Sequence, residues 1–281
     1  MADNDTFLAA CVQMRSGIDR ARNVADARAL IAEAAGKGAR FIATPEMTNV
    51  VDRKADRLFE TLPEEDALSE IVAFSEAAKE HGVFLLIGSM AVKIGERRAA
   101  NRSFLFAPDG SVAARYDKIH MFDVDLPNGE SWKESNVYRP GDRAVLAKTP
   151  LAKIGLTVCY DVRFARLYRM LARAGAEVLC VPAAFTRQTG IAHWKTLLTA
   201  RAIENGAFVI APAQGGTHED GRQTYGHSLI IGPWGEILAE ADGDEPGVVV
   251  AEINPAAARE ARQRIPNLGL EQFFEVSIVT V

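Results

Sequence analysis

Short apolar runs alternate along the chain with stretches of helical periodicity. Runs rich in β-branched residues are typical of buried strands, whereas apolar residues three and four apart indicate amphipathic helices. The turn sequence Ala-Pro-Asp-Gly at 107–110 also predicts a hairpin. For the first half we predict strands over 7–13, 40–43, 83–88, 103–106 and 112–116, and helices over 19–36 and 66–80.

The second half repeats this pattern after an irregular stretch over residues 117–150. That stretch is too long for an ordinary connection, and long loops within compact domains are usually functional. A Gly-Pro-Trp-Gly turn predicts a second hairpin. Here we predict strands over 154–158, 177–181, 208–211, 228–231, 237–239 and 248–252, and helices over 164–174 and 192–204.

The alternation of strands and helices predicts an α/β fold with mixed sheets and helices outside them. The two similar halves suggest two sheets that face each other. No Pro/Ser-rich linker separates the halves, so we expect a single domain over residues 1–281.

Composition and charge exclude several classes of partner. The chain is 48% hydrophobic and 25% charged, which is ordinary for a globular protein. A net charge of −5 does not indicate a basic surface of the kind that binds nucleic acid, so we expect no nucleic-acid partner. The apolar runs are too short to span a bilayer and no apolar leader is evident, so we expect a cytoplasmic protein without a membrane partner.

Cysteines and histidines are few and scattered. The three cysteines have no paired spacing, which argues against both a disulfide framework and a zinc site. None of the five histidines belongs to a His-Glu-x-x-His pattern, and no GxGxxG or Walker loop is present. We therefore expect chemistry carried out by protein side chains alone.

Cys159 lies where a predicted strand meets a predicted helix. A thiol at this junction is near free N–H groups and the positive end of a helix, which favours the thiolate. The turn also directs the side chain out of the sheet edge, as in serine nucleophile elbows. Burial in the core is the commoner fate of a free cysteine. Taken alone, Cys159 could therefore be either a nucleophile or a structural core residue.

Two charged residues follow other predicted strands. Glu46 directly follows a buried strand, where a carboxylate would have a raised pKa and could act as a base, although it could also be an exposed turn residue. Lys118 could stabilise an oxyanion, although taken alone it reads as a surface lysine. Because three strands end at these residues, a thiol, a carboxylate and an ammonium could meet at one edge.

The motifs around these residues resemble those of the nitrilase superfamily, the carbon–nitrogen hydrolases. They are Thr-Pro-Glu-Met, Tyr-Asp-Lys-Ile-His-Met-Phe and Cys-Tyr-Asp-Val-Arg-Phe, and the similarity covers residues 7–253. The resemblance implies a helix–sheet–sheet–helix sandwich and a Glu-Lys-Cys triad. Glu46 would then be the general base, Lys118 would stabilise the tetrahedral intermediate, Cys159 would be the nucleophile, and Glu134 would orient Lys118. The implied mechanism needs no metal or organic cofactor.

Finer similarities point to the branch of deaminated glutathione amidases, which implies a small, carboxylate-bearing amide substrate. A carboxylate needs a cation, and Arg163 is the first candidate and Arg187 the second, although either could be structural. The backbone N–H of Tyr160 would help to hold the oxyanion. Phe185 and Trp194 could line the pocket, but aromatic residues at helical spacing are more often core.

Several alternatives remain open at this point. Carbamoyl-amine hydrolases and aliphatic nitrilases use the same triad, and a catalytically silent scaffold would keep the fold alone. The resemblance also implies a homodimer or larger homo-oligomer. The segment from about residue 254 departs from the basic C-terminal segment of the branch, and we expect it to form an oligomer contact.

Overall fold

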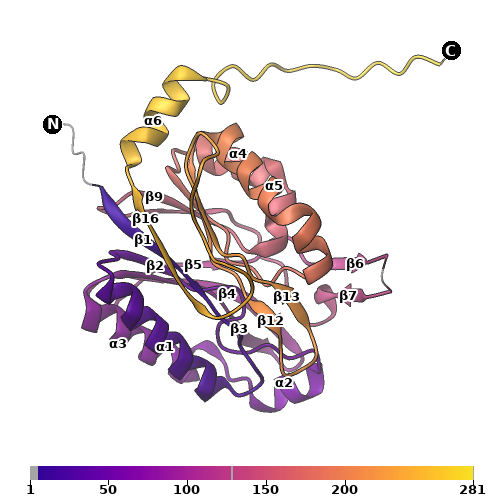
Figure 1. Ribbon diagram of the computed structural model, residues 1–281. Coiled ribbons are helices and arrows are strands. Elements are labelled where there is room, and N and C mark those ends of the chain that lie inside the picture. Colours follow the sequence, from indigo (N-terminus) through magenta and orange to yellow (C-terminus); the bar gives the residue numbers. More distant parts are fainter. Residues whose placement is uncertain (1–5, 128, 281) are drawn as a thin grey trace.

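The computed structural model describes residues 6–127 and 129–280, and its first sheet comes mainly from the N-terminal half (Figure 1). Its strand order is β16-β1-β2-β3-β4-β5, with β1, β2 and β3 parallel and the others antiparallel. The strands are β1 (Phe7–Gln13), β2 (Phe41–Ala43), β3 (Phe84–Gly95), β4 (Arg98–Phe106), β5 (Val112–Asp117) and β16 (Gly247–Ile253).

The second sheet has the strand order β15-β14-β11-β10-β9-β8, with a parallel centre of β9, β10 and β11. Its remaining neighbours are antiparallel. The strands are β8 (Val145–Lys148), β9 (Lys153–Leu156), β10 (Val178–Cys180), β11 (Phe208–Ala211), β14 (Leu229–Ile231) and β15 (Ile237–Glu240).

Helices cover the outer face of each sheet, as Figure 1 shows. Helices α1 (Arg20–Gly36) and α3 (Ser69–His81) lie on the first sheet, and α4 (Ala165–Arg173) and α5 (Arg187–Asn205) lie on the second. The result is a helix–sheet–sheet–helix sandwich, which confirms the predicted α/β class.

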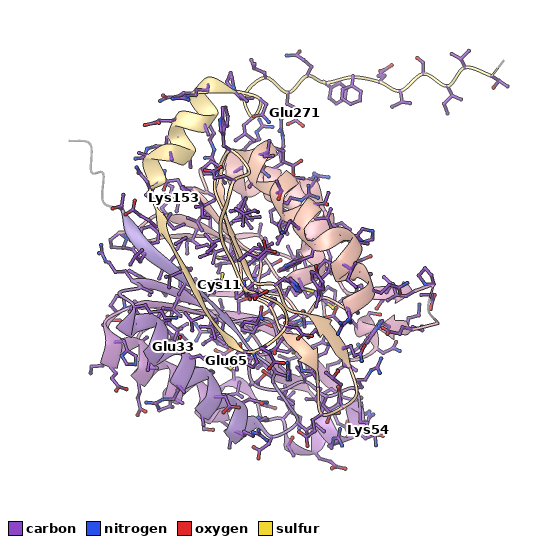
Figure 2. The ribbon with its side chains drawn as sticks, viewed as in Figure 1. Cys11, Glu33, Lys54, Glu65, Lys153 and Glu271 are labelled. Carbon is purple, nitrogen blue, oxygen red and sulfur yellow. The ribbon has the colours of Figure 1, made fainter. Side chains whose placement is uncertain are left out.

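Because side chains alternate between the two faces of β1, this strand contributes to two hydrophobic cores. Ala9 and Cys11 belong to the core between the sheets, and Cys11 lies at the centre of the molecule (Figure 2). Ala10 and Val12 belong to a second core that includes Ile31 of α1. Because both faces of this strand are buried, its sequence is apolar from Phe7 to Val12.

Gly88 of β3 packs tightly against the segments that follow β2 and β10. A Cβ atom at Gly88 would lie 2.0 Å from the Thr44 carbonyl oxygen and 2.4 Å from the Pro182 Cβ atom. Only glycine fits there. Because glycine has no side chain, the segment after β2 can pack against the segment after β10. Both segments contribute to the site described below.

Several short elements escaped prediction. The stretch 117–150 contains β6 (Asp123–Asp125) and β7 (Ser131–Lys133), which pair as a hairpin, followed by β8. The sequences of β6 and β7, Asp-Val-Asp and Ser-Trp-Lys, are mostly polar and lack the apolar run that marks a buried strand. Helix α5 also begins five residues earlier than the predicted helix over 192–204. The other unpredicted elements are α2 (Ala55–Thr61), β12 (Gly215–Thr217), β13 (Gln223–Tyr225), α6 (Pro255–Arg264) and the short 3₁₀ turns 65–67, 134–136 and 159–163.

An extended tail follows α6 and projects away from the body in Figure 1. Glu271 near its start pairs with Arg169 and Arg173 of α4. Beyond it, large apolar side chains face solvent, with Phe273 98% and Ile278 91% exposed. Within the described residues, no helix has the length and apolar character needed to cross a bilayer.

Candidate active site

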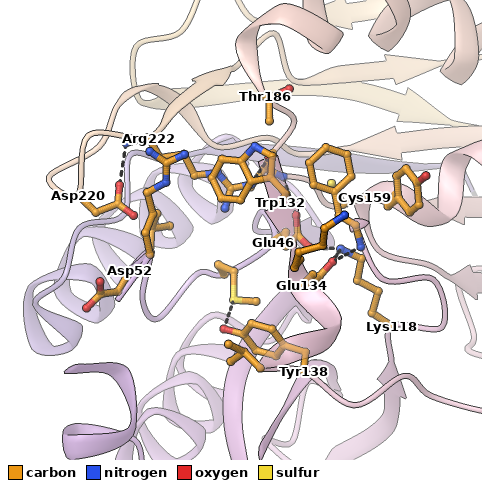
Figure 3. A pocket seen from close by; sticks show the side chains of 18 of the residues that line it. Glu46, Asp52, Lys118, Trp132, Glu134, Tyr138, Cys159, Thr186, Asp220 and Arg222 are labelled. Carbon is orange, nitrogen blue, oxygen red and sulfur yellow. Dashed lines mark hydrogen bonds and ion pairs between the residues drawn. The ribbon is translucent and has the colours of Figure 1, made fainter. Parts of the chain in front are cut away.

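Four of the sequence-predicted side chains meet in one buried cavity between the ends of strands. Glu46 follows β2, Lys118 follows β5, Glu134 follows β7 and Cys159 follows β9. Figure 3 shows these side chains directed toward one another. The cavity has a volume of about 440 Å³ and all four residues line it.

The turn after β9 holds Cys159 in a strained conformation. Its φ angle is +50°, in the left-handed region that residues other than glycine rarely adopt. Met47, directly after Glu46, has a φ angle of +56°. Backbone strain of this kind persists only where the surrounding structure enforces it, and it clusters at functional sites.

Lys118 lies between the two glutamates and bonds to both. Its Nζ atom donates to Glu46 Oε1 at 2.9 Å and to the Glu134 carboxylate at 2.8 and 3.0 Å. Lys118 is only 2% exposed and Glu46 only 3%. Burial by itself lowers the pKa of Lys118, but the charges of Glu134 and then Glu46 raise it well above its usual value. Lys118 is therefore a permanent cation in this setting.

Asn101 of β4 joins the same network, and sequence analysis missed it. Its Nδ2 atom donates to Glu46 Oε1 at 2.9 Å and to Glu134 Oε1 at 3.1 Å. The backbone completes the positioning: the Ala184 N–H donates to Glu46 Oε2 at 2.9 Å, and the Phe122 N–H donates to Glu134 Oε2 at 2.6 Å. Asn101 lies in the part of β4 that precedes the predicted strand over 103–106, so no local pattern marked it.

The protonation states differ from those expected from the sequence. Burial alone would raise the pKa of Glu46, but the charges of Lys118 and Arg222 and the bonds to Lys118 and Cys159 bring that pKa below its usual value. The sequence-based expectation of a raised pKa was therefore wrong. Neighbouring charges contributed by distant segments outweigh desolvation here.

The thiol of Cys159 is also not the thiolate expected at a strand–helix junction. Burial and the nearby Glu46 carboxylate raise its pKa well above the usual value, although Lys118 opposes this. Helix α4 begins only at Ala165, after the 3₁₀ turn, so its positive end is not directly at the sulfur. The resting site therefore contains a neutral thiol beside an ionised carboxylate.

Asp161 links the segment of Cys159 to that of Lys118. Its buried carboxylate accepts the Val158 N–H at 2.9 Å and the Tyr116 hydroxyl at 2.6 Å. It also bonds to the backbone and ring nitrogens of His120, at 3.0 and 2.7 Å. Tyr116 and His120 flank Lys118 in sequence, so one carboxylate fixes the thiol and the ammonium relative to each other.

The remaining predicted residues separate into two groups. Tyr160 and Phe185 line the cavity. Trp194 lies behind Phe185, with ring centroids 4.8 Å apart, and its indole N–H bonds to the His227 carbonyl. Arg163 is not among the lining residues; it lies 3.3 Å from the His193 ring and near the rings of Tyr160 and Phe185. Arg187 is also outside the lining and pairs with Asp244 at 3.5 Å.

Two other arginines line the cavity, and sequence analysis identified neither. The guanidinium carbons of Arg53 and Arg222 lie 4.4 and 4.7 Å from the ring centroid of Trp132. Arg222 precedes a three-residue strand of the β12–β13 hairpin, and Arg53 precedes α2. Both elements were themselves unpredicted, so no local pattern placed these cations at the site.

Comparison with known proteins identifies the family. The model of the carbon-nitrogen hydrolase family matches residues 8–263. The chain belongs to this family. Members of the family hydrolyse carbon–nitrogen bonds other than peptide bonds, so the predicted hydrolase class and the resemblance to the nitrilase superfamily are confirmed.

Individual relatives agree with this assignment over almost the whole chain. A deaminated glutathione amidase of Synechocystis is 42% identical over 93% of this chain and 97% of its own length. The human omega-amidase NIT2 is 34% identical over 93% of each chain. The prediction of an amidase is confirmed at the level of this class of enzyme.

Solved structures show the same fold. The NitFhit protein of C. elegans superimposes with a TM-score of 0.89 at 32% identity, and the match covers 97% of this chain and 66% of that longer one. A carbon-nitrogen hydrolase from Helicobacter pylori gives a TM-score of 0.85 at 26% identity over 95% of this chain and 96% of its own.

Proposed function

We propose that this enzyme hydrolyses the terminal amide of a small carboxylate-bearing acid through a thioester on Cys159. The observation that carries the proposal is the buried contact of Glu46, Lys118 and Cys159, with Lys118 bonded to both glutamates. The names of the amidase relatives support the choice of a carboxylate-bearing amide.

Acylation begins with the neutral thiol. Because Glu46 is ionised and lies beside Cys159, it takes the thiol proton as sulfur attacks the amide carbon. Lys118, fixed by Glu134, and the backbone N–H of Tyr160 stabilise the oxyanion. Glu46 then protonates the leaving nitrogen, the carbon–nitrogen bond breaks and ammonia departs, which leaves the acyl group on sulfur.

Deacylation follows the same steps with water as the nucleophile. Glu46 is again ionised and takes a proton from the water that attacks the thioester carbon. The carbon–sulfur bond breaks, the thiolate regains a proton from Glu46, and the free acid leaves. Each turnover therefore consumes one water and releases one ammonia and one carboxylic acid.

Three alternatives compete with this proposal, two enzymes that use the same four residues and one catalytically silent scaffold. A carbamoyl-amine hydrolase or an aliphatic nitrilase could use the same nucleophile and base. A silent scaffold of this fold would not need a strained cysteine paired with a buried acid and ammonium. The named relatives favour the amidase over all three.

A substrate panel tests the proposal. Ammonia release is measured for ω-amides of short dicarboxylates, N-carbamoyl compounds and nitriles, with wild-type protein and Cys159→Ala. The proposal expects the highest kcat/KM with the acid-bearing ω-amides and no release above background for the variant. Preferred turnover of a nitrile or carbamoyl compound, or unchanged turnover by Cys159→Ala, would overturn it.

We also propose a single catalytic unit that acts as a homodimer or larger homo-oligomer in the cytoplasm. The tail after α6 supports a subunit contact, because five large apolar side chains within residues 273–279 are 79–98% exposed and contiguous exposed apolar surface marks interaction sites. Cys11, Cys159 and Cys180 are all free thiols, as is usual in a reducing compartment. Sedimentation of the full chain and of a chain ending at residue 268 tests the contact.

A further inference from the structure

The β6–β7 hairpin, which precedes Glu134, belongs to neither of the large sheets. Within the described residues its two short strands pair only with each other. The outer residues of each strand are exposed, whereas Val124 and Trp132, which lie opposite each other, are partly buried. A two-stranded hairpin of this size is not stable by itself in water. Its position beside the cavity therefore depends on the side chains that reach the rest of the enzyme.

Trp132 contacts cations from two distant segments. The guanidinium carbon of Arg53, which precedes α2, lies 4.4 Å from the ring centroid, and that of Arg222, which precedes β13, lies 4.7 Å from it. Both distances fall within the range of about 6 Å for cation–π contacts. All three residues line the cavity. In the view of Figure 3, Trp132 lies between Arg222 and Cys159, so we name the end around Trp132 the outer end and the end beside Cys159 the inner end.

Neither guanidinium forms an ion pair with a described acid. Asp52, next to Arg53 in sequence, pairs with Arg57 instead, at 2.5 and 2.7 Å. Asp220 accepts the backbone N–H of Arg222 at 2.9 Å and not its guanidinium. The negative face of an indole attracts a cation, so the ring stabilises two charges that no carboxylate neutralises.

Arg222 is also bound to the segment that positions the proposed base. Its guanidinium donates to the Ala184 carbonyl at 2.7 Å, and the Ala184 N–H donates to Glu46 Oε2 at 2.9 Å. The Tyr225 N–H donates to the Phe185 carbonyl at 3.0 Å, so the strand that follows Arg222 is attached to this segment as well. The ring that contacts Arg222 is therefore positioned against the same segment as the base.

The hairpin in turn sets the position of Glu134. The N–H of Phe122, just before β6, donates to Glu134 Oε2 at 2.6 Å, and the Glu134 N–H donates to the Phe122 carbonyl at 3.4 Å. Lys118 bonds to the same carboxylate at 2.8 and 3.0 Å. A shift of the hairpin by one residue would move it about 3.3 Å, which is further than a hydrogen bond can stretch. The contact between Lys118 and Glu134 therefore requires a firmly attached hairpin.

We propose that Trp132 is a positioning residue, whose ring, held by Arg53 and Arg222, fixes the hairpin and so keeps Glu134 bonded to Lys118. It acts through Glu134 and not on the reacting atoms. This inference rests on the proposed function, because the position of Glu134 affects the rate only if Lys118 stabilises the oxyanion. It also gives the two arginines a role in the enzyme before any substrate is bound.

A double-mutant cycle tests whether Trp132 acts through Glu134. Trp132→Leu keeps an apolar side chain but removes the ring, and kcat for ammonia release should fall about tenfold. In Glu134→Ala, which has already lost the contact with Lys118, the further loss on adding Trp132→Leu should be less than about twofold. Trp132→Phe, which retains an aromatic face, should keep about half of the wild-type kcat or more. Losses that multiply, as they do for independent sites, would overturn the inference.

Trp234→Leu is the matched control for the loss of an indole. Trp234 lies in the turn between β14 and β15, is 54% exposed and lies outside the cavity lining. This variant should therefore show the wild-type kcat. An equal loss of kcat in Trp132→Leu and Trp234→Leu would separate the effect from the position of Glu134, and the inference would be wrong.

Hydrogen exchange measured by mass spectrometry follows the hairpin independently of the reaction. Peptides that cover β6 and β7 should exchange at least about tenfold faster in Trp132→Leu and in Arg53→Gln/Arg222→Gln than in the wild type, and at the wild-type rate in Trp234→Leu. Unchanged exchange in the first two variants would contradict the inference, whatever their activity. Faster exchange in both, together with no ammonia release by the wild type, would support the attachment through Trp132 and would instead refute the amidase reaction.

Discussion

Charged side chains are paired with one another at the inner end of the cavity, whereas the cations at its outer end form no ion pairs. At the inner end, Lys118 is shared by Glu46 and Glu134, and Asn101 bridges the same carboxylates. At the outer end, Arg53 and Arg222 form no ion pair with a described acid, although Arg222 is near enough to Glu46 to lower its pKa. A fully bonded set of charges is preorganised for chemistry, whereas unpaired cations are suited to bind a ligand. The contrast separates reactivity from specificity along one cavity.

The largest expected effect comes from breaking the pairing at the inner end. Glu46→Gln keeps the shape but removes the base that accepts the thiol proton, so kcat should fall by about 10³- to 10⁴-fold. Lys118 keeps its contact with Glu134, so the fold should persist. Steady-state ammonia release and circular dichroism measure the two effects.

Glu33→Gln is the matched control for that variant. Glu33 lies on α1 and pairs with Lys37 at the surface, far from the cavity lining (Figure 2). Its kcat should equal that of the wild type. If Glu46→Gln kept more than a tenth of the wild-type kcat, the general-base role would have to be assigned to another group.

Removal of Asn101 tests the hydrogen-bond network at the inner end of the cavity and should have a smaller effect on activity. Asn101→Ala removes a donor from both carboxylates, and kcat should drop by about tenfold. Hydrogen bonds to an ionised carboxylate lower its pKa, so their loss should raise the pKa of Glu46 toward its usual value. Activity requires ionised Glu46, and the acid limb of kcat/KM should therefore move to higher pH.

The pH profile distinguishes that effect from a merely structural one. A damaged fold would lower kcat/KM evenly across the pH range without moving the acid limb. In the wild type, the raised pKa of Cys159 also predicts no inflection near the ordinary pKa of a free thiol, about 8.5. A thiolate mechanism would produce such an inflection.

The smallest effect tests the unpaired outer end. Arg57→Gln releases the buried Asp52 carboxylate, which lines the same end of the cavity as Arg53 and Arg222. An unpaired anion there competes with the substrate carboxylate, so KM for an acid amide should rise about threefold with kcat unchanged. KM for a neutral amide of equal length should stay constant. An equal rise for both amides would indicate a general disturbance of the cavity instead.

Much of the fold and the inner site could be predicted because their signals are local. Cys159, Glu46 and Lys118 each follow a strand whose apolar pattern is plain, and their motifs resemble those of a known family. Asn101 and Asp161 could not be predicted, because their partners come from segments distant in sequence. The pKa shifts of Glu46 and Cys159 were misjudged for the same reason, since each depends on charges from other strands.

The residues at the outer end of the cavity were harder to predict from the sequence. Arg222 and Arg53 adjoin elements too short to show periodicity, and their meeting place is a tryptophan on the unpredicted β7 strand. Arg163, four residues from Cys159 in sequence, lies beside His193 and near the rings of Tyr160 and Phe185, which line the cavity. Its part in binding the substrate carboxylate stays a prediction.

The most direct test of the central claim is mass spectrometry of enzyme quenched with acid during turnover of an ω-amide. The account predicts an acyl adduct, equal to the substrate minus ammonia, on the peptide that contains Cys159, and its absence from Cys159→Ala. An adduct on another residue, or full ammonia release by Cys159→Ala with no adduct, would contradict the proposed thioester mechanism.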